Sequence, residues 1–454
     1  MKKIKIYALL LIGVALITTG FRCTFITAKQ QELLQPVALT WWGTFDDPSD
    51  FSDIIKEYQV VHPNVKVTYR KLRTEEFDTE LIHALAEDRG PDIVSINNKE
   101  LNKWLNNLEP LPATTKMAYT VKQKSLGIKE ETLVEVRETT SITPAKIKEQ
   151  YLDVVSDDVI VNGKVYGLPL SVNTLVLFYN RDLFNNANLA LPPTTWTELQ
   201  TDVKKLTFQD KENKLVQSGI AMGLADNIEY SPDVLALLMM QNGAQMTDGN
   251  RVMFTFVPPG GDKLYNPGPE AVKFYTDFAD PVKEVYTWNQ TFSNSLDAFA
   301  QGKVAMIFGY GYDASYIEGK RQGKLNYAVA RVPQIEGRKE VNVANYWFQT
   351  VTKKSKHVNE SWDFLQFISK AEIAKKYLNR TLRPTALRAL VDEQIQNDQL
   401  SIFASQLLTS ENWYHGKDTT VAEQAFIELV TSVHQGIDVQ KAIELAAQKV
   451  QQTL

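Results

Sequence analysis

The chain has 454 residues, a formal net charge of −5 and a hydrophobic content of 44%. This length exceeds what one hydrophobic core usually serves, so we expect two or three domains. The body of the chain is slightly acidic and lacks a dense basic run, which argues against nucleic acid as the main partner.

The N-terminal segment, residues 1–28, has the features of an export signal or a membrane anchor. Three lysines precede an apolar run over residues 6–17. Cys23 is the only cysteine of the chain, but the preceding Gly20-Phe21-Arg22 does not resemble the small-residue motif of lipoproteins. Cleavage after Ala28 and retention as an uncleaved anchor both stay open. We expect an exported protein at the cell surface or in the periplasm.

Residues 37–96 alternate between strand and helix patterns. Val37–Trp42 forms an apolar run that ends in aromatics, and the apolar positions of residues 51–58 follow helical spacing. Residues 65–69 alternate as a half-buried strand, residues 77–85 repeat apolar positions every four residues, and residues 93–96 give a third strand. This order predicts an α/β layer with a mostly parallel sheet.

The next segment, residues 112–150, differs in composition. It is rich in Thr, Lys and Glu and has a weak helical pattern, so we expect a surface insertion. Strands are predicted again over residues 165–170 and 174–179. Two amphipathic helices, near 421–434 and 439–450, end the chain.

Local helix signals and isolated tryptophans indicate packing. Thr195 and Glu198 predict a capping box at a helix N-terminus. We expect Trp104, Trp196 and Trp362, which lie within helical patterns, to be core residues.

The usual motifs of catalysis and cofactor binding do not occur. The five histidines are scattered singly, and none has a second His or Cys at metal-ligand spacing. Gly309-Tyr310-Gly311 lacks the further glycine or Gly-Lys-Ser/Thr of a phosphate loop, and there is no Gly-x-Ser-x-Gly elbow. We therefore expect no catalytic residue, no metal and no cofactor. Paired carboxylates for glycoside cleavage stay open, because their spacing is spatial rather than sequential.

Aromatic residues gather where predicted strands end, which is where ligands of open α/β sheets commonly lie. Trp41-Trp42 ends the first strand, and Phe308–Tyr312 follows an apolar run in the same way. Trp288, Tyr346-Trp347 and Trp413-Tyr414 are further candidates. Flat rings at such junctions can stack on the apolar faces of a sugar.

Several short motifs, in this order and spacing, give the chain a family resemblance. It resembles extracellular solute-binding proteins of the carbohydrate-uptake type, the maltose-binding-protein-like group that serves ATP-binding-cassette importers. The matching segments are Gly90-Pro91-Asp92-Ile93-Val94, residues 163–169, 177–184 and 193–199, and Phe299-Ala300-Gln301-Gly302-Lys303-Val304-Ala305-Met306.

The resemblance implies two α/β lobes joined by crossing strands, with a ligand held between them by hinge closure. The expected N-terminal lobe is 37–170 plus 340–378, with 112–150 as an insertion, and the expected C-terminal lobe is 171–335 plus 382–454. The expected crossings lie near 169–174, 333–341 and 378–384.

The resemblance also points to ligand-binding residues, and the aromatic and glycine pattern adds Trp288 and Gly311. The predicted set is Trp42, Gly43, Thr44, Asp46, Asn97, Asn98, Tyr179, Trp288, Tyr310, Gly311, Tyr312, Trp347 and Trp413. The chain departs from the family in having tyrosines where tryptophan is common, and Asn97-Asn98 where some members have charged residues.

The function implied is capture of a small-molecule ligand, a sugar or oligosaccharide, by a monomer that delivers it to an ABC transporter permease. Two alternatives stay open. One is an exported polysaccharide-degrading enzyme, and the other is a ligand-sensing protein that presents its closed form to a membrane receptor.

Overall fold

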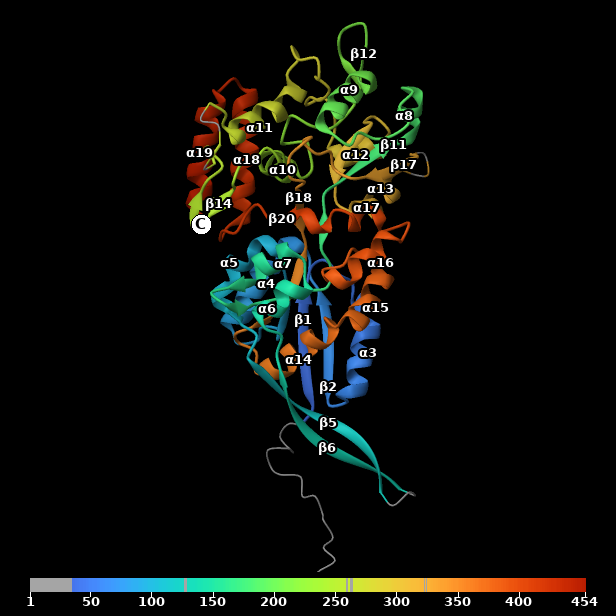
Figure 1. Cartoon of the computed structure of the whole chain (residues 1–454), viewed down its shortest axis with the longest axis vertical. Coiled ribbons are helices and arrows are strands. Elements are labelled where there is room, and N and C mark those ends of the chain that lie inside the picture. Colours follow the sequence, from blue (N-terminus) through green and yellow to red (C-terminus); the bar gives the residue numbers. More distant parts are fainter. Residues whose placement is uncertain (1–34, 126–128, 259, 262–263, 322, 324) are drawn as a thin grey trace, which may run out of the picture.

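The computed structural model describes residues 35–454, except 126–128, 259, 262–263, 322 and 324. The predicted export signal or anchor, residues 1–28, lies outside the described residues. The described chain forms two α/β lobes stacked along the long axis of the molecule (Figure 1). No helix in the described part combines the length and apolar character needed to span a membrane.

The first lobe is built on a sheet with strand order β2-β1-β3-β19-β4, and β9 also pairs with β19. β1 pairs in parallel with β2 and β3, which confirms the predicted strand–helix–strand–helix–strand layer. The returning strand β19 enters from the other lobe and therefore runs antiparallel to β3. The strands are β1 (Val37–Gly43), β2 (Val65–Lys71), β3 (Ile93–Asn97), β4 (Leu108–Glu109), β9 (Leu168–Pro169) and β19 (Trp347–Thr352).

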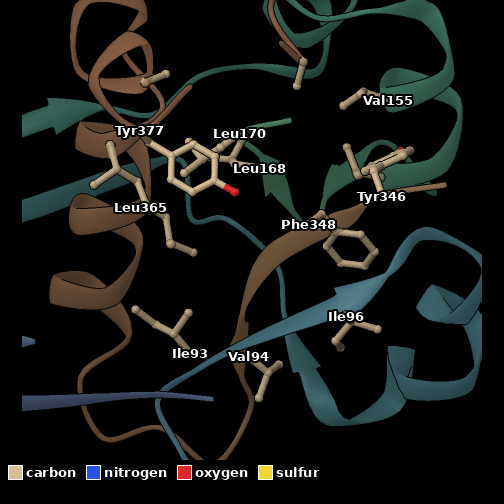
Figure 2. Close-up of a cluster of buried hydrophobic side chains, with 14 of the residues drawn as sticks. Ile93, Val94, Ile96, Val155, Leu168, Leu170, Tyr346, Phe348, Leu365 and Tyr377 are labelled. Carbon is tan, nitrogen blue, oxygen red and sulfur yellow. The ribbon is translucent and has the colours of Figure 1, made fainter. Parts of the chain in front are cut away.

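Helices cover this sheet and supply the first hydrophobic core. Ile93, Val94 and Ile96 of β3 lie among Phe348 of β19 and Leu365 of α14, all almost fully buried (Figure 2). Trp104 and Trp362 are buried in the same core, as predicted. The helices are α3 (Ser52–Val61), α4 (Thr74–Ala86), α5 (Leu101–Trp104), α6 (Pro144–Gln150), α7 (Asp153–Val159), α14 (Val358–Ile368), α15 (Ala371–Thr381), α16 (Val391–Ile395) and α17 (Ser401–Ala404).

The sheet of the second lobe differs from the expected parallel arrangement. Its three strands run in the order β16-β11-β17, and both pairs are antiparallel. Both partners of β11 come from a distant part of the chain and run in the opposite direction to it. Neither is joined to β11 by the single helical crossover that produces a parallel pair. The strands are β11 (Val176–Asn180), β16 (Met306–Gly309) and β17 (Tyr327–Ala330).

The helices of the second lobe include the two amphipathic helices predicted at the C-terminus. Trp196 is buried in this core, and Thr195 and Glu198 form the predicted capping box. The helices are α8 (Arg181–Asn186), α9 (Trp196–Leu206), α10 (Ser231–Gln241), α11 (Pro267–Thr276), α12 (Ser295–Ala300), α13 (Asp313–Arg321), α18 (Thr419–His434) and α19 (Val439–Gln451).

A small sheet of three strands connects the lobes. β10 (Asn173–Thr174) pairs with β18 (Asn342–Asn345), which pairs with β20 (Ser410–Glu411). Apolar residues after the expected crossing at 378–384, including Ala386 and Leu390, are buried in the first core. Residues 402–407 contact both lobes, since Ala404 and Leu407 are buried in the first core whereas Ile402 and Phe403 pack against second-lobe residues. We propose that 385–395 belongs to the first lobe and that the third crossing lies later than expected.

The segment 112–150 forms a long hairpin followed by α6. β5 (Thr114–Ser125) and β6 (Lys129–Thr140) pair antiparallel and project from the end of the first lobe that is remote from the second lobe (Figure 1). Further short strand pairs are β7 (Ile160–Val161) with β8 (Lys164–Val165), β12 (Phe208–Gln209) with β13 (Leu215–Gln217), and β14 (Thr247–Asp248) with β15 (Arg251–Val252).

Candidate ligand-binding cleft between the lobes

A cavity of about 320 Å³ lies between the lobes, at the ends of β1 and β3 and the start of β19. Its size falls within the range of small-molecule sites. First-lobe side chains form most of the wall, Asn345 comes from the crossing strand β18, and α18 closes the far side. The lining residues are Thr44, Thr74, Phe77, Asp78, Ser95, Asn97, Lys99, Glu100, Asn345, Trp347, Thr419, Thr420 and Glu423.

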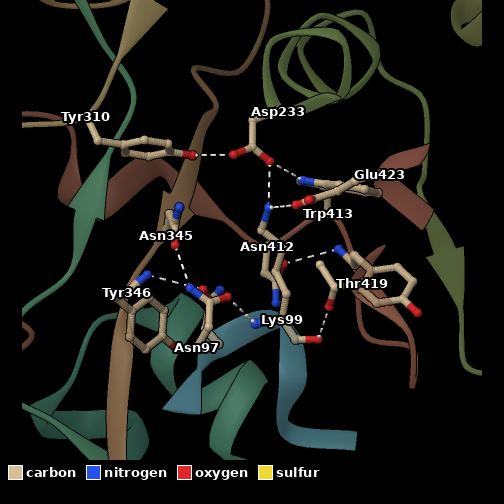
Figure 3. Close-up of polar contacts among 12 residues, drawn as sticks. Asn97, Lys99, Asp233, Tyr310, Asn345, Tyr346, Asn412, Trp413, Thr419 and Glu423 are labelled. Carbon is tan, nitrogen blue, oxygen red and sulfur yellow. Dashed lines mark hydrogen bonds and ion pairs between the residues drawn. The ribbon is translucent and has the colours of Figure 1, made fainter. Parts of the chain in front are cut away.

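A chain of amide and hydroxyl groups runs across this cavity from one lobe to the other. Asn97 Nδ2 donates to Asn345 Oδ1 over 2.7 Å, and Asn345 Nδ2 donates to the Tyr312 hydroxyl over 3.2 Å. The oxygen of the Asn97 amide caps the turn after β3 by accepting from the Lys99 backbone N–H over 3.1 Å. Asn97, at a strand end, is thus fixed in orientation by its own turn and by the connecting strand β18 (Figure 3).

Aromatic rings from both lobes meet beside this polar chain. Trp347 stacks on Phe45 with ring centroids 4.2 Å apart and planes 6° apart. Tyr312 meets Phe45 edge-on at 5.3 Å and stacks on Tyr310 at 5.4 Å. The Arg383 guanidinium carbon lies over the Phe45 ring, 4.1 Å from the ring centroid. Trp347, Phe45 and Tyr312 are all only partly buried, so their rings remain accessible at the cavity edge.

A buried carboxylate, Asp233, organises the second-lobe wall. It lies in the first turn of α10 and accepts from the Tyr310 hydroxyl over 2.7 Å and from Trp413 Nε1 over 2.6 Å. Lys99 of the first lobe reaches the same carboxylate over 2.8 Å and contacts Glu423 of α18 over 2.8 Å (Figure 3). One acid therefore positions two aromatic rings and a cation from the opposite lobe.

The surroundings of this cluster shift the pKa values of its members. Burial alone would lower the pKa of Lys99, but the charges of Asp233 and Glu423 outweigh it and raise that pKa above its usual value. Burial, followed by the nearby Asp233 carboxylate, raises the pKa of Tyr310. Lys99 is therefore an ammonium group and Tyr310 a neutral donor at neutral pH.

Three of the predicted residues, Thr44, Asn97 and Trp347, line the cavity. Tyr310, Tyr312 and Trp413 lie behind its second-lobe side without lining it, and Tyr310 and Trp413 are buried in the second core. Asn97 and Trp347 therefore share one cavity, whereas a crevice that also includes Tyr310 stays a prediction.

Two predicted residues at and after the end of β1, Gly43 and Asp46, serve the first lobe instead. The Asp46 carboxylate is 2% exposed, forms an ion pair with Arg383 and accepts from the Tyr377 hydroxyl over 2.7 Å. A Cβ atom at Gly43 would lie 2.5 Å from the Tyr69 hydroxyl, so glycine is required there for packing rather than for approach of a ligand.

Asn98 and Trp42 also face away from the cavity wall. Asn98 Nδ2 donates to Asp158 over 3.1 Å, and its amide oxygen accepts from the Tyr346 backbone over 3.2 Å. Trp42 packs against the first core with Arg70 over its ring at 4.9 Å. Asn97 is the last residue of β3 and Asn98 begins the turn that follows, and the hydrogen bonds of Asn98 hold its side chain against the first lobe.

The structure does not bring Tyr179, Trp288 or Gly311 into the cavity. Tyr179 lies at the end of β11 that is remote from β10 and packs on Phe184 at 5.1 Å. Trp288 is fully buried, stacks on Phe292 at 4.6 Å and donates to Asn227 over 2.9 Å. A Cβ at Gly311 would lie 3.0 Å from the Phe403 ring, so its small size also serves packing.

Most residues that line the cavity were not predicted from the sequence, and neither were several that make the contacts between the lobes. Phe45 lies between two predicted residues, and Lys99 directly follows Asn97-Asn98, so the strand-end argument could have included both. Asp233, Asn345 and Glu423 carry no local signal, because only the fold brings α10, β18 and α18 together at this point. Among the described residues, no three His, Cys, Asp or Glu side chains form a group that could hold a metal ion.

Comparisons with known proteins agree with this architecture. A putative binding protein of Brucella abortus is 25% identical over 271 residues, covering 58% of this chain and 61% of that protein. The maltodextrin-binding protein MdxE of Bacillus subtilis is 27% identical over 284 residues, covering 59% and 61%. The chain thus matches about three fifths of the length of these relatives.

Solved structures match over nearly the whole chain. A cyclo/maltodextrin-binding protein complexed with maltotetraose has a TM-score of 0.69 at 17% identity, covering 92% of this chain and 97% of that one. A protein with mannobiose bound has a TM-score of 0.63 at 20% identity, covering 92% and 100%. These likenesses establish a two-lobe solute-binding fold. The model of the bacterial extracellular solute-binding proteins matches residues 42–375. This chain belongs to the bacterial extracellular solute-binding protein family.

Proposed function

We propose that the chain captures a sugar or oligosaccharide in the cavity between its lobes, as the substrate-binding component of an ATP-binding-cassette importer. The observation that carries this proposal is the combination, in one inter-lobe cavity, of Trp347 with the amides of Asn97 and Asn345. A sugar needs directional partners for its hydroxyls and an apolar plane for its C–H face, and this wall offers both.

The wall can supply a useful affinity without any covalent step. Micromolar binding requires about −8 kcal/mol. A few hydrogen bonds to Asn97, Asn345 and Thr419 contribute roughly 1 kcal/mol net each. Burial of a sugar face against Trp347 adds about 25 cal/mol for each Å² of apolar surface removed from water.

Relatives support the ligand class. The chain is similar to maltodextrin-binding and galactooligosaccharide-binding proteins of Bacillus subtilis and to solved structures with maltotetraose and mannobiose bound. We therefore propose neutral oligosaccharides as the first compounds to test.

The experiment is a calorimetric titration of the purified chain with maltotriose, maltotetraose, mannobiose, mannotriose and galactooligosaccharides. We expect at least one to bind with micromolar or better affinity and to quench tryptophan fluorescence. Trp347→Ala should abolish the fluorescence change, whereas Trp288→Phe, a substitution in the buried core of the second lobe, should retain it. Absence of binding across the whole panel would overturn the carbohydrate assignment.

We propose that the ligand leaves chemically unchanged. The acids at the cavity are engaged in ion pairs: Glu423 with Lys99, and Asp78 and Glu100 with Lys103. Incubation with each bound oligosaccharide should release no new reducing ends. Their release would favour an exported polysaccharide-degrading enzyme.

We further propose that the chain is exported, is held at the cell surface or in the periplasm, and works as a monomer with a membrane permease. The family is extracellular, and one relative is a solute-binding lipoprotein of Streptococcus pneumoniae. Ligand-loaded protein should stimulate the ATPase of its permease in liposomes. Binding to a sensor kinase without such stimulation would indicate the sensing role instead.

A further inference from the structure

Lys99 makes a charged contact that crosses the cavity. It lies in the turn after β3 of the first lobe, yet its ammonium is 2.8 Å from Asp233 of α10 and 2.8 Å from Glu423 of α18. The side chains of Lys99 and Asp233 are each only 4% exposed. The attraction between two opposite charges is stronger in such poorly hydrated surroundings than in water. Opening of the lobes would break this ion pair and expose both charged groups to water.

The nearest comparable lysine, Lys103, makes no such crossing. It lies one helical turn further along the chain, and its ion-pair partners are Asp78 and Glu100 of the same lobe. The two lysines therefore offer a natural contrast, because opening the lobes would break the pairs of Lys99 and leave those of Lys103 intact.

The charges around the cavity are unbalanced. Asp78, Glu100 and Glu423 line it, and Asp233 lies behind its second-lobe side. Lys99 is the one cation among the described lining residues, and Lys103 pairs with Asp78 and Glu100, so these four carboxylates are matched by two ammonium groups. An anionic ligand would meet these carboxylates at short range. A cationic ligand would have to compete with Lys99 for Asp233 and Glu423. An uncharged ligand leaves the pairing in place.

We infer that Lys99 is the closing and selectivity residue of this protein: its ammonium joins the lobes through Asp233 and Glu423, and closure in this form accepts uncharged ligands and rejects acidic ones. The selectivity half rests on the proposed sugar-binding function, whereas the closing half does not.

The closing half is tested without ligand. Spin labels on Glu80→Cys of α4 and Lys441→Cys of α19, in a Cys23→Ser background, report the distance between the lobes. We expect a dominant short distance in the parent and at least a tenfold fall in the closed-to-open ratio in Lys99→Met. The Glu423 side chain is 38% exposed in its ion pair with Lys99, so Glu423→Gln should fold normally. It should lower the closed-to-open ratio by a smaller factor than Lys99→Met does.

Lys103→Met is the matched control and should retain the parent distribution. An unchanged distance distribution in both Lys99→Met and Glu423→Gln would overturn the role of Lys99, as would an equal shift in Lys103→Met.

The selectivity half is tested with neutral and acidic pairs that differ only at C6, galactobiose against digalacturonate and mannobiose against dimannuronate. We expect the neutral member to bind at least tenfold more tightly, and this preference to shrink in Glu423→Gln. Equal or tighter binding of a uronate would overturn the selectivity. If no member of either pair binds but the labels report opening in Lys99→Met, the carbohydrate proposal fails while the closing role stands.

Discussion

Two of the contacts that join the lobes at the cavity differ in chemistry. One is ionic and pairs Lys99 with the buried Asp233 and the partly exposed Glu423, each at 2.8 Å. The other is aromatic, Tyr312 of the second lobe against Phe45 and Trp347 of the first, at centroid distances of 5.3 and 6.4 Å. The ionic contact depends on the protonation of its members, whereas the aromatic contact depends on area and shape.

The two contacts meet in the second lobe through Tyr310. This ring stacks on Tyr312, and its hydroxyl donates to Asp233. Asp313 supports the same ring, since it accepts from the Tyr310 backbone over 2.7 Å and from the Tyr230 hydroxyl over 2.8 Å. On this proposal, charge holds the lobes together, while the rings shape the surface that a ligand meets.

The largest effect should come from Asp233→Asn, which removes the charge at the centre of the ionic contact. Lys99 would keep only the partly exposed Glu423 as an ionic partner. The Asn side chain would also offer a single acceptor oxygen to the three donors that Asp233 now serves, which are Lys99, Tyr310 and Trp413. We expect the free energy of unfolding to fall by about 3 kcal/mol, in the range for breaking a buried pair. Chemical denaturation measures it.

Asp277→Asn gives the control for this variant. Asp277 pairs with Lys283 on the solvent side of the same lobe, so its loss should change the free energy by less than about 0.5 kcal/mol. An equal loss of unfolding free energy in Asp233→Asn and Asp277→Asn would mean that the buried contacts of Asp233 contribute no more stability than an exposed ion pair.

The second prediction concerns pH and the support of the aromatic contact. Burial raises the pKa of Asp313 from 3.8 to about 6. Because the folded state binds the proton more tightly, this group stabilises the fold fully below pH 3.8, and that stability is lost as pH rises through 6. The shift corresponds to at most about 3 kcal/mol. Between pH 4 and 6, unfolding free energies of the parent should fall relative to Asp313→Asn. If the plots of unfolding free energy against pH are parallel for the parent and Asp313→Asn, the raised pKa of Asp313 is contradicted.

The third prediction breaks the aromatic contact. Trp347→Ala removes the ring that stacks on Phe45 at the cavity edge, so we expect about 2 kcal/mol of binding energy to be lost, or roughly thirtyfold in Kd. The inter-lobe label distance should change little, because the ionic contact remains. Trp42→Ala, at a strand end but outside the cavity lining, should leave Kd nearly unchanged. A stronger effect of Trp42 would restore the original sequence-based assignment of that residue.

Much of the fold could be predicted because its elements carry local signals. The strands of residues 37–96, the capping box at Thr195 and the two C-terminal helices each follow from periodicity or capping chemistry. The second sheet was harder. Its strand directions depend on which distant segments pair with β11, and no pattern within a strand records its partner.

The residues of the site also fall into those that the sequence indicates and those that only the fold brings together. Asn97 and Trp347 were implied by the family resemblance, and the structure places them opposite each other where β3 ends and β19 begins. Trp288 and Trp347 look alike as isolated tryptophans, yet one is enclosed by α12 neighbours and Phe292 while the other lines a cavity. Lys99 has no acidic partner close to it in the sequence that its ammonium contacts, and only the approach of α10 and α18 gives it Asp233 and Glu423.

The smallest effect should come from a contact on the connecting strands. His415 follows β20 and lies 2.8 Å from the buried Asp158 of α7. Burial would lower the pKa of His415, but Asp158 and Asp157 outweigh it and raise that pKa above 6.5. Stability from this pair is therefore complete below pH 6.5 and is lost as pH rises through the folded value.

Because the His415 side chain is 37% exposed, solvent screening should limit its contribution to less than about 1 kcal/mol. The destabilisation caused by His415→Gln should accordingly be larger at pH 6 than at pH 9 in denaturation experiments. The inter-lobe label distance should not change, since Asp158 and His415 meet beside the connecting strand β20 rather than across the cavity. If His415→Gln opens the lobes as Lys99→Met is expected to, then closure is held along the whole interface, and the ionic contact at the cavity loses its special role.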